Sequence, residues 1–148
     1  MDMVRLSVPG TLPYRDVVLR VVASVCRLVR LGVEHQQETS HGSHVADFDD
    51  KVVSAVGEAF NNIAQHAYGG SGLGEARMEL AYERDLLTIR MFDTGAGFNF
   101  SEEPGQDLEP LRESHMGLEI IRACMDEVSY LQGDRVTPNV LTLTKRYV

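Results

Sequence analysis

Segments with a helical hydrophobic period and segments that favour strands follow one another along this chain of 148 residues. Apolar residues recur at three-and-four spacing within residues 14–31, 47–67 and 117–127, which predicts three helices. The predicted strands are 3–8, 76–82, 87–91, 128–131 and 140–147. This order predicts an α+β fold, a two-layer α/β sandwich in which a mixed, mostly antiparallel sheet carries helices on one face.

The stretches between these elements are polar or rich in glycine. Residues 34–45 are predicted to form a loop, and a turn around Arg84 and Asp85 is predicted to close a hairpin. Residues 92–116 lack any period, and we expect a long loop that serves as a functional lid or is disordered. No internal repeat or dividing linker is found, so residues 1–148 are expected to form a single domain.

The charge balance argues against some classes of binding partner. The chain has 14 Lys+Arg and 22 Asp+Glu, a formal net charge of −8, which argues against partners such as nucleic acid or an anionic membrane. The N-terminus lacks the layout of a signal peptide, and three arginines interrupt the longest apolar stretch. We therefore expect a cytoplasmic protein, in which Cys26 and Cys124 are reduced, packed thiols.

Histidines and acidic residues lie before and at the start of the second predicted helix. His35, His41 and His44 could suggest a metal site, but no cysteine or carboxylate pair completes one, so none is predicted there. An acidic cluster is expected to form the first turn of the helix, where it suits the helix dipole: Asp47, Asp49 and Asp50.

The polar face of predicted helix 47–67 is the first candidate site. Glu58, Asn62 and His66 are spaced four residues apart and share one ridge, while the opposite arc is apolar. A surface helix usually carries lysine and glutamate, whereas this face carries mainly amides. A carboxylate and an amide oxygen on one ridge could hold a hard cation and position a water or hydroxyl; the alternative is a solvated face.

Two further candidates contain glycine. Asp93 precedes Gly95 and Gly97 at the exit of a predicted strand, where glycines allow the backbone to turn sharply near a ligand. Residues 114–118, Ser-His-Met-Gly-Leu, enter the third predicted helix, whose N-terminus could bind phosphate. A simple turn, and capping by Ser114, are the structural alternatives.

These three motifs together resemble the GHKL (Bergerat-fold, histidine-kinase-like ATPase) superfamily of histidine kinases, gyrase B and MutL. The matching segments are Glu-Ala-Phe-Asn-Asn-Ile-Ala-Gln-His-Ala-Tyr at 58–68, Asp-x-Gly-x-Gly-Phe at 93–98 and Met-Gly-Leu-x-Ile at 116–120. Within the superfamily the chain is most similar to the anti-sigma factor serine/threonine kinases of the RsbW and SpoIIAB type. The likeness covers nearly the whole chain.

The resemblance implies a role for each matching residue. Asn62 would bind Mg²⁺ between the nucleotide phosphates, with His66 beside it, and Glu58 would be the general base for a substrate hydroxyl. Asp93 would accept the adenine amino group of ATP. The remaining residues would contact the nucleotide as the lid closes: Gly95, Gly97, Ser114, His115, Met116, Gly117 and Leu118.

Three positions depart from the family's pattern. His115 replaces the first glycine of the usual G-x-G-L sequence, and Asn61 stands where a small hydroxyl residue is common. The family often has a threonine near the nucleotide in the last strand, where Val140 is expected here, with Thr137 and Thr142 as approximate substitutes. These differences bear on affinity and catalysis more than on the fold.

The function implied by the resemblance is an ATP-dependent serine/threonine kinase and anti-sigma regulatory factor. It would phosphorylate a STAS-type anti-sigma factor antagonist, bind a sigma factor and form a homodimer through residues 4–31. The alternative is a nucleotide-gated protein-binding module with little or no kinase activity. A third hypothesis, a structural adaptor without nucleotide, requires all three motifs to be coincidental.

Overall fold

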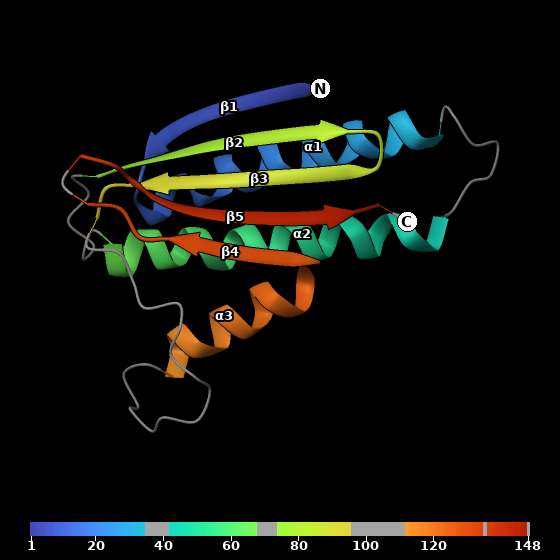
Figure 1. The fold of residues 1–148 in the computed structure, drawn as a ribbon. Coiled ribbons are helices and arrows are strands. Elements are labelled where there is room, and N and C mark those ends of the chain that lie inside the picture. The colour runs from blue at the N-terminus through green and yellow to red at the C-terminus, as the bar shows by residue number, and fades with distance from the viewer. Residues whose placement is uncertain (35–41, 68–73, 96–111, 135, 148) are drawn as a thin grey trace.

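Three helices lie on one side of a five-stranded sheet (Figure 1). The structure is a computed structural model that describes residues 1–34, 42–67, 74–95, 112–134 and 136–147. The strands are β1 (Asp2–Pro9), β2 (Glu75–Glu83), β3 (Leu86–Asp93), β4 (Glu127–Leu131) and β5 (Asn139–Arg146). The helices are α1 (Arg15–Glu34), α2 (Gly42–Asn62) and α3 (Arg112–Cys124), with a 3₁₀ turn η1 (Leu12–Tyr14) and a π-helical turn η2 (Ile63–Ala67). The α+β two-layer prediction is confirmed.

The sheet order is β1-β2-β3-β5-β4, and every neighbouring pair is antiparallel. The predicted hairpin is confirmed: β2 and β3 pair from Arg77↔Phe92 to Glu83↔Leu86. Arg84 lies in the tight turn between them with φ 55°, a left-handed conformation that such a turn requires. In this arrangement, alternate side chains of each strand point toward the helices.

The core lies between the sheet and the helices. Met78 and Leu80 of β2, and Leu87, Ile89 and Met91 of β3, are fully or almost fully buried. The helix residues that cover them follow the predicted spacing and are also buried: Val18, Val22, Val25 and Val29 of α1; Val52, Val56 and Phe60 of α2; and Leu118 and Ile121 of α3. Burial of this apolar surface is the main stabilising term.

Helix α2 begins five residues earlier than predicted, so the loop prediction is wrong at 42–45 and the acidic first turn does not exist. Tertiary contacts hold the helix just after the extension, at residues 48 and 49. Phe48 packs edge-on against Tyr147 at 5.2 Å between ring centroids, and Asp49 accepts two hydrogen bonds from Arg30 of α1. Such contacts stabilise helical turns that local sequence alone does not favour.

Helix α3 is also displaced from its predicted range. It begins at Arg112 rather than 117, so residues 112–116 of the expected loop are helical, and it ends at Cys124 rather than 127. The earlier end has a clear cause, because the backbone N–H of Asp126 donates to Thr144 O of β5 and so already belongs to the sheet. The rest of the expected loop, 96–111, lies outside the described residues.

Over the described part of the chain, no helix is both long enough and apolar enough to cross a membrane.

Candidate functional site

Asp93 ends β3 with its carboxylate on the helix side of the sheet. It follows Ile89 and Met91 in the strand's alternation and is only 6% exposed. Its Oδ1 accepts the backbone N–H of Gly95 at 3.1 Å and the Nδ2 of Asn139 at 2.8 Å. None of the described groups donates to Oδ2. One oxygen of this carboxylate is therefore held in place, and the other remains an acceptor for a ligand.

Asn62 and Glu58 lie one helical turn apart at the C-terminal end of α2. Asn62 is buried, and its Nδ2 atom has no hydrogen-bond partner within the described residues. A buried amide without a partner costs free energy, so such groups are found where a ligand or water completes them. Among the described residues, nothing completes the hydrogen bonding of Asn62 Nδ2.

Helix α3 brings a glycine against this pair. A β-carbon on Gly117 would lie 3.2 Å from Glu58 Oε2 and 3.8 Å from both Asn62 Oδ1 and Asn62 Nδ2. The absence of a side chain at 117 thus lets α3 approach the two polar groups of α2 closely. Three residues predicted from two separate motifs are brought together in space.

A cation from α1 covers the other side of the same stretch of α2. The Arg15 guanidinium packs over Gly57, where a β-carbon would be 2.5 Å from Nη2. Its Nε atom is buried and has no hydrogen-bond partner in the part of the chain that is described. The segment that carries Glu58 therefore lies between a basic residue of α1 and the glycine of α3.

The Asp93 group and the α2 group lie at the same end of the molecule. In Figure 1 the tip of β3 and the C-terminal end of α2 are both at the left of the view. The two elements that carry these residues, α2 with Glu58 and Asn62 and β3 with Asp93, therefore end at the same edge of the sandwich.

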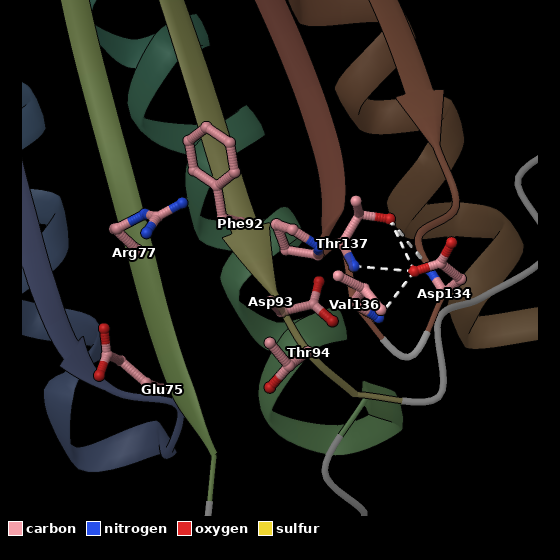
Figure 2. Close-up of a pocket in the computed structure, with 9 residues that line it drawn as sticks. Glu75, Arg77, Phe92, Asp93, Thr94, Asp134, Val136 and Thr137 are labelled. Carbon is pink, nitrogen blue, oxygen red and sulfur yellow. Dashed lines mark hydrogen bonds between the residues drawn. The ribbon is translucent and has the colours of Figure 1, made fainter.

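A cavity of about 420 Å³ opens at this edge on the outer face of the sheet (Figure 2). Arg77 lies over the Phe92 ring, with its guanidinium carbon 4.5 Å from the ring centroid. The turn between β4 and β5 closes the other side, and the cavity is lined by Glu75, Arg77, Phe92, Asp93, Thr94, Asp134, Val136, Thr137 and Pro138. Arg77 and Phe92 alternate with buried residues, so the cavity faces away from the helices.

For most of the other predicted site residues, the structure describes the backbone but not the side chain. Leu118 is 4% exposed and belongs to the core. His66 lies in η2, and Ser114, His115 and Met116 lie in α3, but their side chains, like the whole of Gly97, are outside the described residues. Of the residues expected to face phosphate, Ser114 falls in the first helical turn, where backbone N–H groups have no acceptor within the helix.

The residue opposite Asp93 in the last strand is Asn139, which the sequence reasoning missed. Val140 pairs with Phe92, one position along the strand from the residue opposite Asp93. The alternation of β5 holds the signal: Leu141 and Leu143 are buried on the helix side, and Asn139, two residues earlier, shares that side.

The donor set fits Mg²⁺ together with a phosphate ligand. Asn62 Oδ1 and the Glu58 carboxylate are hard oxygen donors at one place, as Mg²⁺ prefers. Within the described ranges no group of three or more His, Cys, Asp or Glu side chains could hold a metal. Mg²⁺ commonly uses one or two protein oxygens and completes its octahedron with water and phosphate oxygens, which these residues allow.

Comparison with known proteins agrees with this geometry. Residues 9–145 match the family described as "Histidine kinase-like ATPase domain". A serine-protein kinase RsbW of Bacillus mycoides (strain KBAB4) is 26% identical over 144 residues, covering 92% of this chain and 81% of the relative. Another, from Oceanobacillus iheyensis, is 30% identical over 135 residues, covering 86% of this chain and 77% of the relative. The chain therefore belongs to the histidine kinase-like ATPase domain family.

Proposed function

We propose that this protein is an ATP-dependent serine/threonine kinase and anti-sigma regulatory factor. It phosphorylates a STAS-type anti-sigma factor antagonist, binds a sigma factor, and acts as a single cytoplasmic domain over residues 1–148. The observation that supports it best is the approach of Gly117 to Glu58 and Asn62, which puts a candidate base and a candidate metal ligand beside the helix that follows the predicted lid. The relatives that carry the name serine-protein kinase RsbW support the reaction class.

The described residues divide the work of nucleotide binding. Asp93 Oδ2 accepts a hydrogen bond from the adenine amino group, because Oδ1 is already engaged by Gly95 and Asn139. Asn62 Oδ1 is a ligand for Mg²⁺, which neutralises phosphate charge when bound. The first turn of α3, which holds Ser114 and His115, directs its free backbone N–H groups to phosphate, and Met116 and Gly117 follow in the next turn.

Glu58 takes the proton in the transfer step. As the acceptor serine Oγ forms its bond to the γ-phosphorus, the bond from that phosphorus to the β–γ bridging oxygen breaks, and ADP leaves with the electron pair. The hydroxyl proton moves to the Glu58 carboxylate. The work of the protein is positioning and charge neutralisation, as in other phosphoryl transfers.

The test combines labelled Mg-ATP with STAS proteins encoded near the gene. Glu58→Gln should keep nucleotide binding in calorimetry and lose transfer, whereas Asn62→Ala should lose Mg²⁺-dependent binding. Glu83→Gln is the matched control, because Glu83 is exposed at the opposite, hairpin end of the sheet. Unchanged transfer by Glu58→Gln would remove the general base from the mechanism.

One observation favours a second function, a nucleotide-gated binding module. A general base is usually oriented by a hydrogen bond from a third group. Within the described residues, no hydrogen bond orients the Glu58 carboxylate. If wild-type protein binds Mg-ATP and a partner but forms no phosphoprotein, the chain is a nucleotide-gated binding module.

The surface of residues 4–31 supports homodimerisation. Helix α1 carries two apolar stripes: one is buried, and Val17, Leu28 and Leu31 on the other are each more than 40% exposed. The neighbouring edge strand β1 adds Met3, also exposed. An exposed apolar stripe beside a free sheet edge suits a second copy, which light scattering of wild type and Leu28→Glu would reveal.

A further inference from the structure

Asn139 is a buried amide whose two ends bind three different segments. Its side chain is on the helix side at the start of β5, and the residue is 4% exposed. Nδ2 donates to Asp93 Oδ1 at 2.8 Å and to the Gly95 carbonyl at 3.1 Å, and Oδ1 accepts the Gly133 N–H at 2.8 Å. The end of β3, the glycine segment after it and the β4–β5 turn are joined through this one side chain.

The partners fix which end of the amide faces which group. Gly133 N–H can only donate, so it faces Oδ1, and the Asp93 carboxylate and Gly95 carbonyl only accept, so they face Nδ2. Both amide hydrogens are used. A flipped amide would set its single oxygen against the carboxylate and carbonyl oxygens, so only one orientation is stable.

The turn that holds Asn139 is itself rigid. A β-carbon on Gly133 would overlap the Thr137 carbonyl oxygen, so the chain is tightly folded there. Asp134 accepts hydrogen bonds from the backbone N–H groups of Thr137 and Val136 and from the Thr137 hydroxyl, which hold the pKa of Asp134 below its ordinary value. The hydrogen bonds within this turn thus help to hold the Asn139 amide in position.

We propose that Asn139 is a positioning residue that sets base specificity by locking Asp93. Because Nδ2 and the Gly95 N–H both occupy Oδ1, the carboxylate does not rotate and offers Oδ2 as the acceptor. A 6-amino purine donates to that oxygen. A 6-oxo purine presents a second acceptor to it, and the two oxygens repel each other. The inference rests on the proposed nucleotide site.

An isosteric pair of variants tests this assignment. Asn139→Val and Asn139→Thr have the same shape and suit a strand, but only threonine keeps a donor for Asp93. ATP and ITP are the probes, since they differ in the group at the 6-position, amino in ATP and oxo in ITP, and in N1, which carries a hydrogen only in ITP. Calorimetry with Mg²⁺ gives both affinities. Loss of a hydrogen bond to a charged group should lower the ATP-over-ITP ratio about tenfold in Asn139→Val. Asn139→Thr should retain most of it.

The ratio separates positioning from a structural role. A variant that merely loosens the fold weakens the binding of both nucleotides equally, and Thr144→Val, on the opposite face of β5, should leave the ratio unchanged. Equal ratios in wild type and Asn139→Val, or in the valine and threonine variants, would overturn the inference. Absence of ATP binding by the wild type would instead overturn the proposed function.

Discussion

Gly117 of α3 lies directly against Glu58 of α2, with the place of its absent β-carbon 3.2 Å from Glu58 Oε2. That distance is shorter than ordinary van der Waals contact, so the close approach of the two helices depends on glycine at this position. Because Asn62 is also within 3.8 Å of the same point, a change at 117 acts on both polar groups at once.

Gly117→Ala should separate stability from function. In a helix, alanine is more favourable than glycine by about 1 kcal/mol. The opposing effect is the small cost of moving a flexible carboxylate, so the free energy of unfolding should not fall by more than that cost. The added methyl group displaces Glu58 Oε2 by a few tenths of an ångström, and phosphoryl transfer should fall about tenfold because misplaced catalytic groups lose rate steeply. Transfer kinetics and urea unfolding measure the two effects.

Gly32→Ala is the matched control, since Gly32 is also helical and nothing lies within 4 Å of its missing β-carbon. It should gain helix stability and transfer phosphate normally. If Gly117→Ala matches Gly32→Ala in both measurements, the contact with Glu58 has no catalytic meaning.

Gly133→Ala should destabilise the protein, because the new methyl group meets backbone rather than a movable side chain. The atoms in its way are the Thr137 carbonyl and the Pro138 peptide group, so the turn must open. We expect a loss of about 1–3 kcal/mol in the free energy of unfolding, as for other overpacked sites, measured by urea denaturation. Val136→Ala, at a position 90% exposed in the same turn, should change little. A Gly133→Ala protein as stable as wild type contradicts this.

The sequence predicted the fold well wherever one period dominates. Val52, Val56 and Phe60 at helical spacing, and Leu87, Ile89 and Met91 in alternation, are buried as expected. Helix ends were less predictable, because helix propensity is a weak guide to where a helix begins: α2 begins at Gly42 and α3 at Arg112, each five residues before the predicted start. The apolar arc predicted for residues 14–31 likewise divides into a buried and an exposed stripe, which composition cannot distinguish.

The candidate site was predicted in parts but not as an arrangement. The motifs named Glu58, Asn62 and Gly117, but only the packing of α3 on α2 shows that they meet. Asn139 was missed because its role depends on strand register, which the tight turn at Gly133 sets some six residues earlier. Register over that distance is not encoded in any short pattern.

The ion pair between Arg30 and Asp49 should contribute measurably to holding α1 on α2. Two parallel hydrogen bonds of 3.0 and 2.9 Å join the side chains, which are 16% and 22% exposed, and donation to the Asp49 carboxylate raises the pKa of Arg30. A double-mutant cycle with Arg30→Met and Asp49→Asn should give a coupling of about 1–2 kcal/mol. The exposed pair of Asp16 and Arg20 is the comparison, and equal couplings in the two cycles would refute the assignment.

Cys26 should make the protein sensitive to alkali. It is fully buried on α1, and burial raises the pKa of its thiol from 9.0 to about 12. The folded state therefore keeps the proton at pH values where the unfolded chain loses it. The stabilising contribution is complete below pH 9 and is lost as the pH rises toward about 12, at about 1.4 kcal/mol per pH unit.

Urea unfolding of wild type and Cys26→Ala from pH 8 to 11 measures this loss. Burial also raises the pKa of Tyr147, which adds its own pH dependence, but the difference between the two proteins cancels it. That difference should stay constant up to pH 9 and then shift in favour of Cys26→Ala. Curves that remain parallel above pH 9 would show that the thiol ionises as readily in the folded protein as in the unfolded chain, and that its burial does not oppose ionisation.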